Sequence, residues 1–343
     1  MDFAFSAEQE LLRSSARDYL RDRYGDDRVV ALAESDPGWD PATWKELADM
    51  GWLDPSLDLL DHAVIAEESA YALLPAPWFS TVALTWPLLD ASLRDAIAAG
   101  ERSTTLATNG SVTADSEGAL TGTMTLVPDL TSVTDVIVVA SGGLHVVAAT
   151  PDVVVARSTM DRTRRLGELR LSATPARRLD ADPSALADVR RRALALASCE
   201  AVGVAQRALD LAAAYAKTRE QFGRVIGTYQ GVSHKVADIF VALQLGRSLA
   251  YWAAWAVSES DPQADVAAAA AKSAATEGAV LSCEHAIQAH GGIGFTYEHI
   301  LHRYYKRAQW LEAFEGYGRE HRAAVAAAIL DGAENLDSEG AVA

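Results

Sequence analysis

The chain from Ser184 onward contains long helical segments, and one of them is so rich in alanine that it restricts how the chain can pack. Helices are predicted over residues 185–219, 233–258 and 264–290, with one or two more over residues 297–330. The third segment includes five consecutive alanines, Ala267 to Ala271. Because small side chains let helices approach closely, this helix should pack against neighbours on several faces. A C-terminal four-helix bundle is therefore predicted.

The N-terminal part is also predicted to be helical, from residue 6 to residue 96. Ser6 followed by Glu8 and Glu10 is typical of an N-cap with an acidic first turn. Further helices are predicted over residues 41–50, 62–73 and 81–93, and Pro87 marks a kink or boundary in the last of these.

Short β-rich runs occupy the middle of the chain, over residues 104–107, 120–126, 133–139, 144–149, 153–155 and 165–171. Turn signals separate them, at Asn109-Gly110, Glu117-Gly118 and Gly142-Gly143. The predicted organisation is a helical domain over residues 1–100, a small β domain over 101–182, the bundle over 183–335 and a tail over 336–343.

Composition excludes several classes of protein. The chain has 343 residues, half of them hydrophobic, so it can bury a substantial core. A formal charge of −17 argues against a nucleic-acid partner, which would require a dense Lys/Arg surface. The first residues lack the features of a signal peptide and no apolar run reaches membrane-spanning length, so we expect a cytoplasmic protein without membrane insertion. Cys199 and Cys283 are interpreted as buried hydrophobic residues.

Three motifs each allow a structural and a functional interpretation. The run from His290 to Gly294 is either a helix C-cap or a glycine loop that binds a ligand, and it lacks the context of a Rossmann or P-loop motif. Arg219 either complements a helix dipole or binds a pyrophosphate. Glu315, between Phe314 and Gly316, is either a surface carboxylate or a general base in an apolar pocket that raises its pKa.

Two histidines, His299 and His302, lie one helical turn apart. Without further ligands at suitable spacing they do not make a metal site, and we expect them to be solvated or packed. No metal is predicted.

The ordered set of motifs resembles the acyl-CoA dehydrogenase family over nearly the whole chain. The motifs that carry the resemblance are Arg219, Phe222 and Gly223; then Gln230; then Gln288, Gly291, Gly292, Gly294 and Phe295; and last Phe314, Glu315 and Gly316. The resemblance implies a mainly α fold with a small β-barrel-like domain between N-terminal helices and a C-terminal four-helix bundle.

The resemblance also implies the cofactor and the site residues. Arg219, Phe222, Gln288, Gly291 and Gly292 match residues that contact the adenosine and pyrophosphate of FAD, much of it across a subunit interface, and Gln230 matches a further glutamine near the FAD. Glu315 matches the base that removes the α-proton of an acyl-CoA thioester while flavin N5 accepts a hydride from the β-carbon. A backbone N–H beside the base would polarise the thioester carbonyl.

Some relatives carry their base on the helix before the Arg-Phe-Gly motif. The matching position here is about Ala193, which cannot act as a base, and the nearby Glu200 is interpreted as structural.

Two departures from the family pattern affect the flavin pocket. Relatives carry Thr-Glu-Pro-x-x-Gly-Ser-Asp beside the flavin, where this chain has the segment from Thr105 to Gly110. Residues Tyr317 to Arg319 also replace the usual small polar residues after the base, and the β domain is shortened.

Shortened chains of this kind resemble actinobacterial members of the family that assemble as α2β2 heterotetramers and act on steroid side-chain CoA thioesters. The resemblance thus implies an oxidoreductase of lipid or steroid catabolism, in a homotetramer or an α2β2 heterotetramer, that passes electrons to an electron-transfer flavoprotein. Two alternatives are a partner subunit with little activity alone and a flavin oxidase or monooxygenase of the same fold. Retention of Glu315 favours the dehydrogenase, because such oxygenases need no α-proton base.

Overall fold

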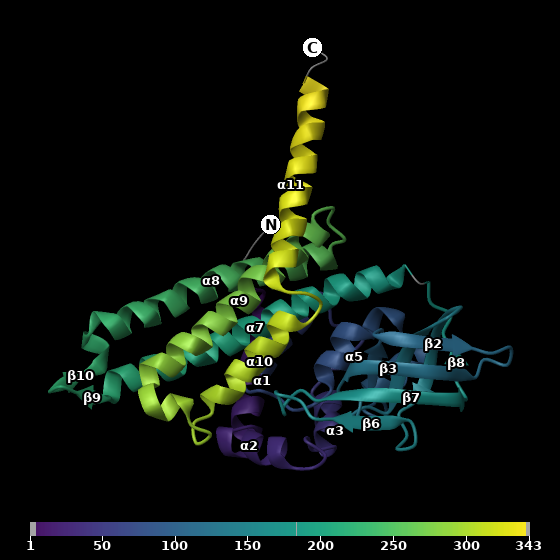
Figure 1. The fold of residues 1–343 in the computed structure, drawn as a ribbon, viewed down its shortest axis with the longest axis horizontal. Coiled ribbons are helices and arrows are strands. Elements are labelled where there is room, and N and C mark those ends of the chain that lie inside the picture. Colours follow the sequence, from purple (N-terminus) through teal and green to yellow (C-terminus); the bar gives the residue numbers. More distant parts are fainter. Residues whose placement is uncertain (1–4, 183, 341–343) are drawn as a thin grey trace. The chain divides into compact units, whose positions relative to one another are not determined.

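The computed structural model describes residues 5–182 and 184–340, with the side chains of residues 332–340 excepted. The start of the chain used to exclude a signal peptide, residues 1–4, and the end of the predicted tail, residues 341–343, lie outside these ranges. The chain divides into two compact units, one made of residues 1–65 and 72–193 and the other of residues 66–71 and 194–343. Figure 1 shows the elements in chain order. The finer domain boundaries drawn from the sequence stay predictions.

The helices of the first unit begin with a capped helix, as predicted. The Ser6 hydroxyl oxygen accepts a hydrogen bond from the backbone N–H of Gln9, and the Gln9 side-chain oxygen accepts one from the backbone N–H of Ser6, forming a capping box. A 3₁₀ turn containing Pro87 divides the helix that was predicted over residues 81–93. The helices are α1 (Ala7–Arg23), α2 (Asp26–Glu34), α3 (Ala42–Asp49), α4 (Leu59–Tyr71), α5 (Trp78–Leu84), η1 (Trp86–Leu88) and α6 (Ala91–Ala98).

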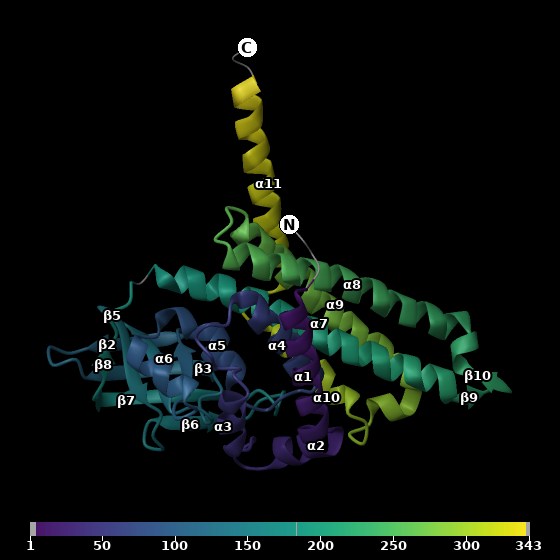
Figure 2. The same cartoon turned by 180° about the vertical axis from the view of Figure 1, so that it is seen from behind.

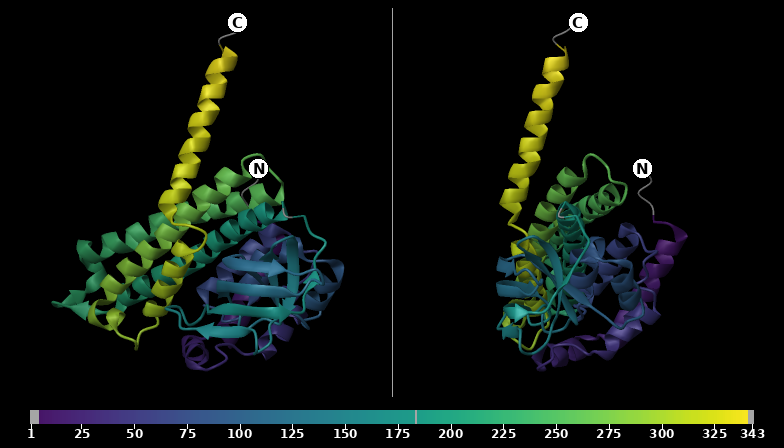
Figure 3. Two further views of the ribbon diagram at one scale, coloured as in Figure 1. Left: turned by 45° about the vertical axis from the view of Figure 1, so that its right-hand side comes forward. Right: turned by 90° about the vertical axis from the view of Figure 1, so that its right-hand side faces the viewer.

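Eight strands form two four-stranded sheets, and the faces of the two sheets share one hydrophobic core (Figure 3). One sheet has the order β1 (Thr104–Ala107), β4 (Asp135–Ala140), β5 (Gly143–Ala148), β8 (Arg177–Arg178). The other has the order β2 (Gly110–Ala114), β3 (Leu120–Pro128), β7 (Leu166–Thr174), β6 (Val154–Arg157). Only the β1–β4 pair is parallel among the pairings described in these sheets.

Six of the eight strands coincide with the predicted β-rich runs, and the two others were missed. In β2 only Val112 is buried, so the segment lacks the alternating apolar pattern that identifies a strand. Its Gly110 was interpreted as part of a turn. Strand β8 has only two residues, both exposed arginines that pair with β5.

A buried histidine and arginine tie α4 to neighbouring parts of the first unit. Arg192, in the first part of α7 (Ala185–Thr218), donates through Nη2 to His62 Nδ1 at 3.0 Å and through Nε to the Val82 carbonyl at 2.7 Å. The His62 ring is fully buried, between Trp78 and Trp86. Burial, followed by the nearby Arg192 charge, lowers the pKa of His62 well below 6.5. Because Nδ1 accepts the bond, this histidine is neutral in the folded chain.

The second unit is an α-helical bundle whose interior is lined with alanine. It contains the rest of α7, the hairpin β9 (Glu220–Gln221) and β10 (Arg224–Val225), η2 (Ile226–Thr228), α8 (Gln230–Ser258), α9 (Ala264–His290), η3 (Gly291–Phe295), α10 (Leu301–Ala313) and α11 (Gly318–Gly340). A cluster of buried alanines joins α7, α8 and α9, namely Ala195, Ala253, Ala256, Ala264, Ala267 and Ala271. As expected, α9 is buried on several faces.

The last residues of α4 belong to this second unit through a hydrogen-bonded network. Glu67 accepts bonds from Arg247 Nη2 at 2.7 Å and from the Tyr251 hydroxyl at 2.7 Å. The Tyr71 hydroxyl donates to Asp210 at 2.9 Å. Glu67 is buried, and hydrogen bonds to its carboxylate are stronger in the low-dielectric interior than they would be in water.

Gly203 lets α4 and α7 approach closely. A Cβ atom at this position would lie 2.1 Å from the Glu67 carbonyl oxygen and 2.9 Å from the Tyr71 backbone nitrogen. Both neighbours are backbone atoms in a helix, so they cannot move aside without cost.

We expect Gly203→Ala to lower the free energy of unfolding by about 1–3 kcal/mol through overpacking. Thermal or urea denaturation measures the change. Gly231→Ala is the matched control, because nothing lies within 4 Å of its Cβ position and alanine favours a helix. An equal effect of the two substitutions would contradict a close approach at Gly203.

His62 should also make stability depend on pH. Since its pKa is lowered on folding, the unfolded chain binds the additional proton as the pH falls below about 6.5. The stabilisation is complete above this pH and is lost as the pH falls toward the folded-state pKa.

We expect His62→Gln, which keeps an acceptor for Arg192 but does not titrate, to reduce the loss of stability on acidification. The difference in slope between wild type and variant should approach about 1.4 kcal/mol per pH unit below pH 6.5. Urea denaturation at pH 7, 6 and 5 measures it, and parallel curves for the two proteins would show that His62 is not the group involved.

Candidate active site

Arg219 and Phe222 lie in a tight hairpin between α7 and α8. Helix α7 ends at Thr218, and the two-residue turn between β9 and β10 consists of Phe222 and Gly223, with φ values of 54° and 79°. Two positive φ values are typical of a type I′ turn, which explains the glycine. The turn holds the Phe222 ring in solvent, 94% exposed. The Arg219 side chain is also exposed, and its carbonyl accepts a bond from Ile226 N at 2.8 Å.

The glycine motif follows the end of α9 directly. Gly291 is the C-cap residue, with φ of 64°, and its N–H bonds to the carbonyls of Gln288 and Ile287. The C-cap interpretation of this glycine is therefore confirmed. Gly291 and Gly292 are exposed, and nothing lies within 4 Å of a Cβ atom built on either. The backbone of Gly291 and Gly292 is thus open to close approach by a ligand, as the ligand-binding interpretation of this motif requires.

These two segments lie at the same end of the bundle. Helices α7, α8 and α9 run alternately up and down, so the C-terminus of α7, the N-terminus of α8 and the C-terminus of α9 meet there (Figures 1 and 2). The rings of Tyr215 and His290 stack at 4.4 Å and link the ends of α7 and α9. Gln230, the first residue of α8, is exposed at this end as well. All six predicted cofactor contacts therefore lie at or near one end of the bundle in the second unit.

Glu315 occupies a different place, in the loop between α10 and α11. The backbone of Glu315 is strained, since this non-glycine residue has φ of 55°, and Gly316 follows it with φ of 100°, which glycine adopts without strain. The Glu315 side chain is exposed, so this chain alone does not supply the apolar pocket expected for a general base. Helix α10 has 13 residues and separates Glu315 from the glycine motif by about 20 Å.

Two side chains that hold this loop were missed from the sequence. Lys272 of α9 and His321 of α11 both bond to backbone carbonyls of residues 312–316. The one signal was Lys272 itself, a charged residue directly after the five-alanine run in a helix predicted to be buried.

The segment that replaces the missing family motif is used for folding. The Thr105 hydroxyl, in β1, is buried and donates to the Pro128 carbonyl at 2.7 Å. Asn109 follows the strand and bonds through Nδ2 to Thr125 at 3.2 Å. The Thr105 hydroxyl is therefore not available to a cofactor.

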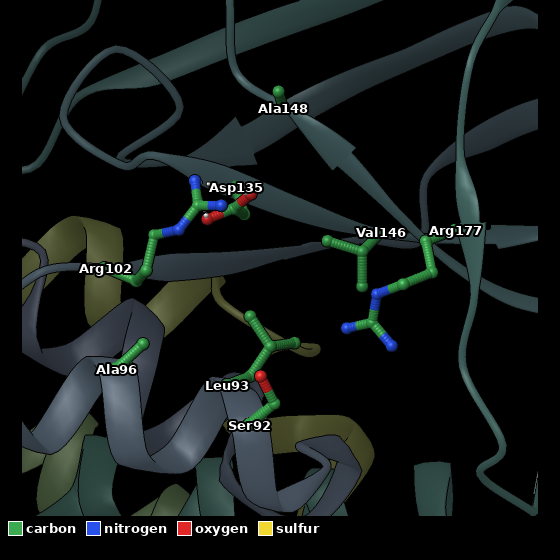
Figure 4. Close-up of a pocket in the computed structure, with 8 residues that line it drawn as sticks. All are labelled: Ser92, Leu93, Ala96, Arg102, Asp135, Val146, Ala148 and Arg177. Carbon is green, nitrogen blue, oxygen red and sulfur yellow. Dashed lines mark hydrogen bonds and ion pairs between the residues drawn. The ribbon is translucent and has the colours of Figure 1, made fainter.

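A groove of about 410 Å³ in the first unit contains none of the predicted site residues (Figure 4). It lies between α6 and strands β4, β5 and β8, and its two cations are already paired. Arg102 forms an ion pair with Asp135 at 3.2 Å, and Arg177 forms one with Asp90 at 2.6 Å. Its carboxylate, Asp135, is held by Arg102, so the groove has no evident catalytic chemistry.

The two histidines considered as metal ligands face different partners. The His299 ring lies 4.5 Å from His290, whereas the His302 ring lies 4.7 Å from Tyr297. Among the side chains of residues 5–182 and 184–331, no group of three or more His, Cys, Asp or Glu residues is arranged to hold a metal ion.

Comparison with known proteins identifies the family. A model of the acyl-CoA dehydrogenase C-terminal domain matches residues 190–330. The chain is 31% identical over 314 residues to acyl-CoA dehydrogenase IpdE2 of Mycobacterium tuberculosis, covering 88% of this chain and 91% of that protein. The chain belongs to the acyl-CoA dehydrogenase family. It is therefore related to oxidoreductases whose members are generally flavin-dependent.

Solved acyl-CoA dehydrogenase structures agree over almost the full length. A variant of the Tcur3481-Tcur3483 steroid ACAD superposes with a TM-score of 0.84 at 28% identity, covering 95% of this chain and 99% of that one. The ChsE4-ChsE5 complex of Mycobacterium tuberculosis superposes with a TM-score of 0.86 at 22% identity, covering 96% and 99%. The predicted fold, helical domains around a small β region, is confirmed.

Among the described residues of this acyl-CoA dehydrogenase, none of the helices has the length and apolar character needed to cross a membrane.

Proposed function

We propose that this acyl-CoA dehydrogenase catalyses the FAD-dependent α,β-dehydrogenation of an acyl-CoA thioester to the trans-2-enoyl-CoA, with Glu315 as the base. The observation that carries the proposal is the exposed Glu315 carboxylate on a loop of constrained backbone, in the sequence context Phe314-Glu315-Gly316. A side chain presented at the surface in this way can meet a substrate.

Removal of the α-proton requires a carboxylate that binds a proton more strongly once the substrate is in place. An α C–H bond next to a thioester is a weak acid, so the base must be partly desolvated and the carbonyl polarised. An acyl chain lying over Glu315 would exclude water from its carboxylate, which favours proton abstraction. FAD, when bound, supplies the electron acceptor that takes the hydride from the β-carbon.

The open end of the bundle fits the adenosine diphosphate part of FAD. Arg219 offers an exposed guanidinium for a diphosphate, and Gly291 and Gly292 leave their backbone open to close approach. Phe222 offers an aromatic face, and Gln230 and Gln288 offer amide groups. These six residues would hold the cofactor, and Glu315, which lies one helix away from them, would face the substrate.

We further propose that a second chain completes the site. Exposed aromatic side chains lie in or near the glycine motif: Phe295 is 86% exposed and Tyr297 is 80% exposed. Phe222 is exposed as well. Helix α8 exposes Phe240, Val241 and Leu245 on one side. Such apolar surface is typical of a subunit interface. The assembly would be a homotetramer or an α2β2 heterotetramer with another acyl-CoA dehydrogenase subunit.

The Tcur3481-Tcur3483 and ChsE4-ChsE5 structures are each named for two proteins, and this supports the heteromeric form. The first of these names also motivates a steroid side-chain CoA thioester as substrate. An electron-transfer flavoprotein is the expected acceptor of the electrons.

A second candidate function is a partner subunit with little activity alone. The buried Thr105 hydroxyl favours it, because this segment replaces residues that lie beside the flavin in relatives. In that case the partner would supply much of the flavin pocket. A flavin oxidase or monooxygenase of the same fold is less well supported, because it would have no use for Glu315.

We expect Glu315→Gln to lower the rate of flavin bleaching by acyl-CoA by at least about 10²-fold, because glutamine cannot accept the α-proton. The rate is measured anaerobically with a panel of acyl-CoA and steroid side-chain CoA thioesters. The protein is prepared alone and together with the product of the adjacent gene.

The matched control is Glu117→Gln, an exposed glutamate in the turn between β2 and β3 that should leave the rate unchanged. Full bleaching by Glu315→Gln would show that another residue is the base. Absence of flavin from both preparations would contradict the dehydrogenase proposal, and flavin in the two-chain preparation alone would support the partner-subunit form.

We expect Arg219→Ala to weaken FAD retention about 10- to 100-fold, since a charge-assisted bond to a phosphate is lost. Equilibrium dialysis against FAD, followed by the flavin-to-protein ratio, measures it. Arg219→Lys keeps the charge but not the planar guanidinium group, so its FAD retention should lie between those of wild type and Arg219→Ala. Arg21→Ala, which changes an exposed arginine of α1, should retain FAD as wild type does. Unchanged retention in Arg219→Ala would exclude Arg219 as a phosphate contact.

A further inference from the structure

A buried lysine of α9 contacts the loop that carries Glu315. Lys272 is fully buried, and its Nζ donates to the carbonyl oxygens of Glu312 at 3.1 Å and Gly316 at 3.0 Å. These two carbonyls lie on either side of Glu315 in the sequence. One ammonium group therefore spans the loop.

The position of Lys272 suits the end of a helix. Helix α10 ends at Ala313, so the carbonyl of Glu312 is among the last four, which have no partner within the helix. A cation at a helix C-terminus is also favoured by the helix dipole. Burying an ammonium group is otherwise costly, and burial lowers the pKa of Lys272 to about 8. Four glutamates oppose this effect.

The same loop is held from α11. His321 Nε2 lies 3.1 Å from the Glu315 carbonyl oxygen. Arg322 donates to Ser273 Oγ at 3.1 Å and forms an ion pair with Glu277, which joins the start of α11 to the same part of α9 as Lys272. A residue with positive φ, such as Glu315, keeps its conformation only when its surroundings determine it. Lys272 and His321 provide such surroundings.

The charges that face Lys272 come from every element around it. The acidic groups are Glu277 on α9, Glu312 on α10, Glu315 in the loop and Glu320 on α11. The basic groups near them are His321, Arg322 and Arg319, all on α11. Lys272 is a buried cation among four carboxylates, and their charges favour its protonated form.

We propose that Lys272 is a positioning residue for proton abstraction. Its bonds to the Glu312 and Gly316 carbonyls fix the backbone that places the Glu315 carboxylate. The inference rests on the proposed role of Glu315 and adds a second group to it. Lys272 itself touches neither substrate nor cofactor in this account.

The test uses the flavin-loaded protein, with its partner chain if the partner is required. Lys272→Met removes both bonds and the charge, and Lys272→Gln keeps a donor but removes the charge. Lys45→Met is the matched control, because that lysine is exposed and pairs only with Asp49 on its own helix. The limiting rate of flavin reduction is measured against acyl-CoA concentration from pH 5.5 to pH 9.

We expect Lys272→Met to lower the limiting rate about 10²-fold, because a small displacement of a reacting group has an effect of this size. The acyl-CoA concentration at half-maximal rate should change by less than about threefold, since substrate binding does not depend on Lys272. The wild-type rate should fall as the pH rises through the Lys272 pKa of about 8, because its bonds to the loop weaken when the charge is lost, and this limb should be absent from both variants. Lys272→Gln should retain more of the rate than Lys272→Met.

Hydrogen exchange of the backbone amides in residues 313–318 provides a measurement that does not depend on catalysis. Exchange should be faster in Lys272→Met than in wild type and unchanged in Lys45→Met. If Glu315→Gln keeps full activity, the role of Glu315 is wrong while the exchange result still reports on the anchoring of the loop.

The proposal is overturned if the active fraction of either variant has the wild-type limiting rate and pH profile, or if exchange in the loop is unchanged. A loss of activity that only follows a loss of folded protein or bound flavin would make Lys272 a stability residue and would also overturn it. Should Lys272→Met fail to fold, Lys272→Gln provides the same comparisons.

Discussion

The close packing of α9 against its neighbours is the interaction on which the second unit depends. Alanine at most inward positions lets α7, α8 and α9 approach until their backbones are nearly in contact, and Gly203 does the same for α4 and α7. Dispersion contacts over such a length are individually small and collectively large. Because the helices are closely packed, the positions of their ends define where the connecting loops begin and end.

Two consequences of this packing bear on function. The alternating directions of α7, α8 and α9 bring the Arg219 hairpin and the glycine motif to one end, although about 70 residues separate them in the sequence. The middle of α9 meets the far end of α10, where Lys272 reaches the loop of Glu315. A rigid helix thus supports both parts of the proposed site, which suits chemistry that requires precise placement.

The exposed groups in this site have a common explanation. Phe222, Phe295 and Glu315 all lie at the surface of the single chain, yet an aromatic ring in water and a solvated base are both unfavourable for their proposed roles. A cofactor, a substrate and a second chain would each remove part of this surface from water. The site is best understood as one contribution to an assembled active site. The use of Thr105 within the fold makes the contribution of a partner more important.

The sequence by itself determined the fold class, most elements and the motif set. Periodicity and alanine content predicted the long helices, Pro87 predicted a break, and short β-rich runs between turn signals predicted six strands, because each of these signals is local. The strands β2 and β8 were missed because their stability comes from pairing with neighbouring strands rather than from their own residues. The motifs were identified by their order along the chain, and the roles of Arg219, Phe222, Gln230, Gln288, Gly291, Gly292 and Glu315 stay predictions.

Only the tertiary structure decided which groups meet. Lys272 read as a single charge in an alanine-rich helix, and nothing in the sequence indicated that the carbonyls of Glu312 and Gly316 would accept its hydrogen bonds. The same holds for His62 with Arg192 and for the Thr105 hydroxyl with Pro128. Composition and periodicity determine which side chains are buried, but the partner of a buried polar group depends on helix packing that brings distant segments together.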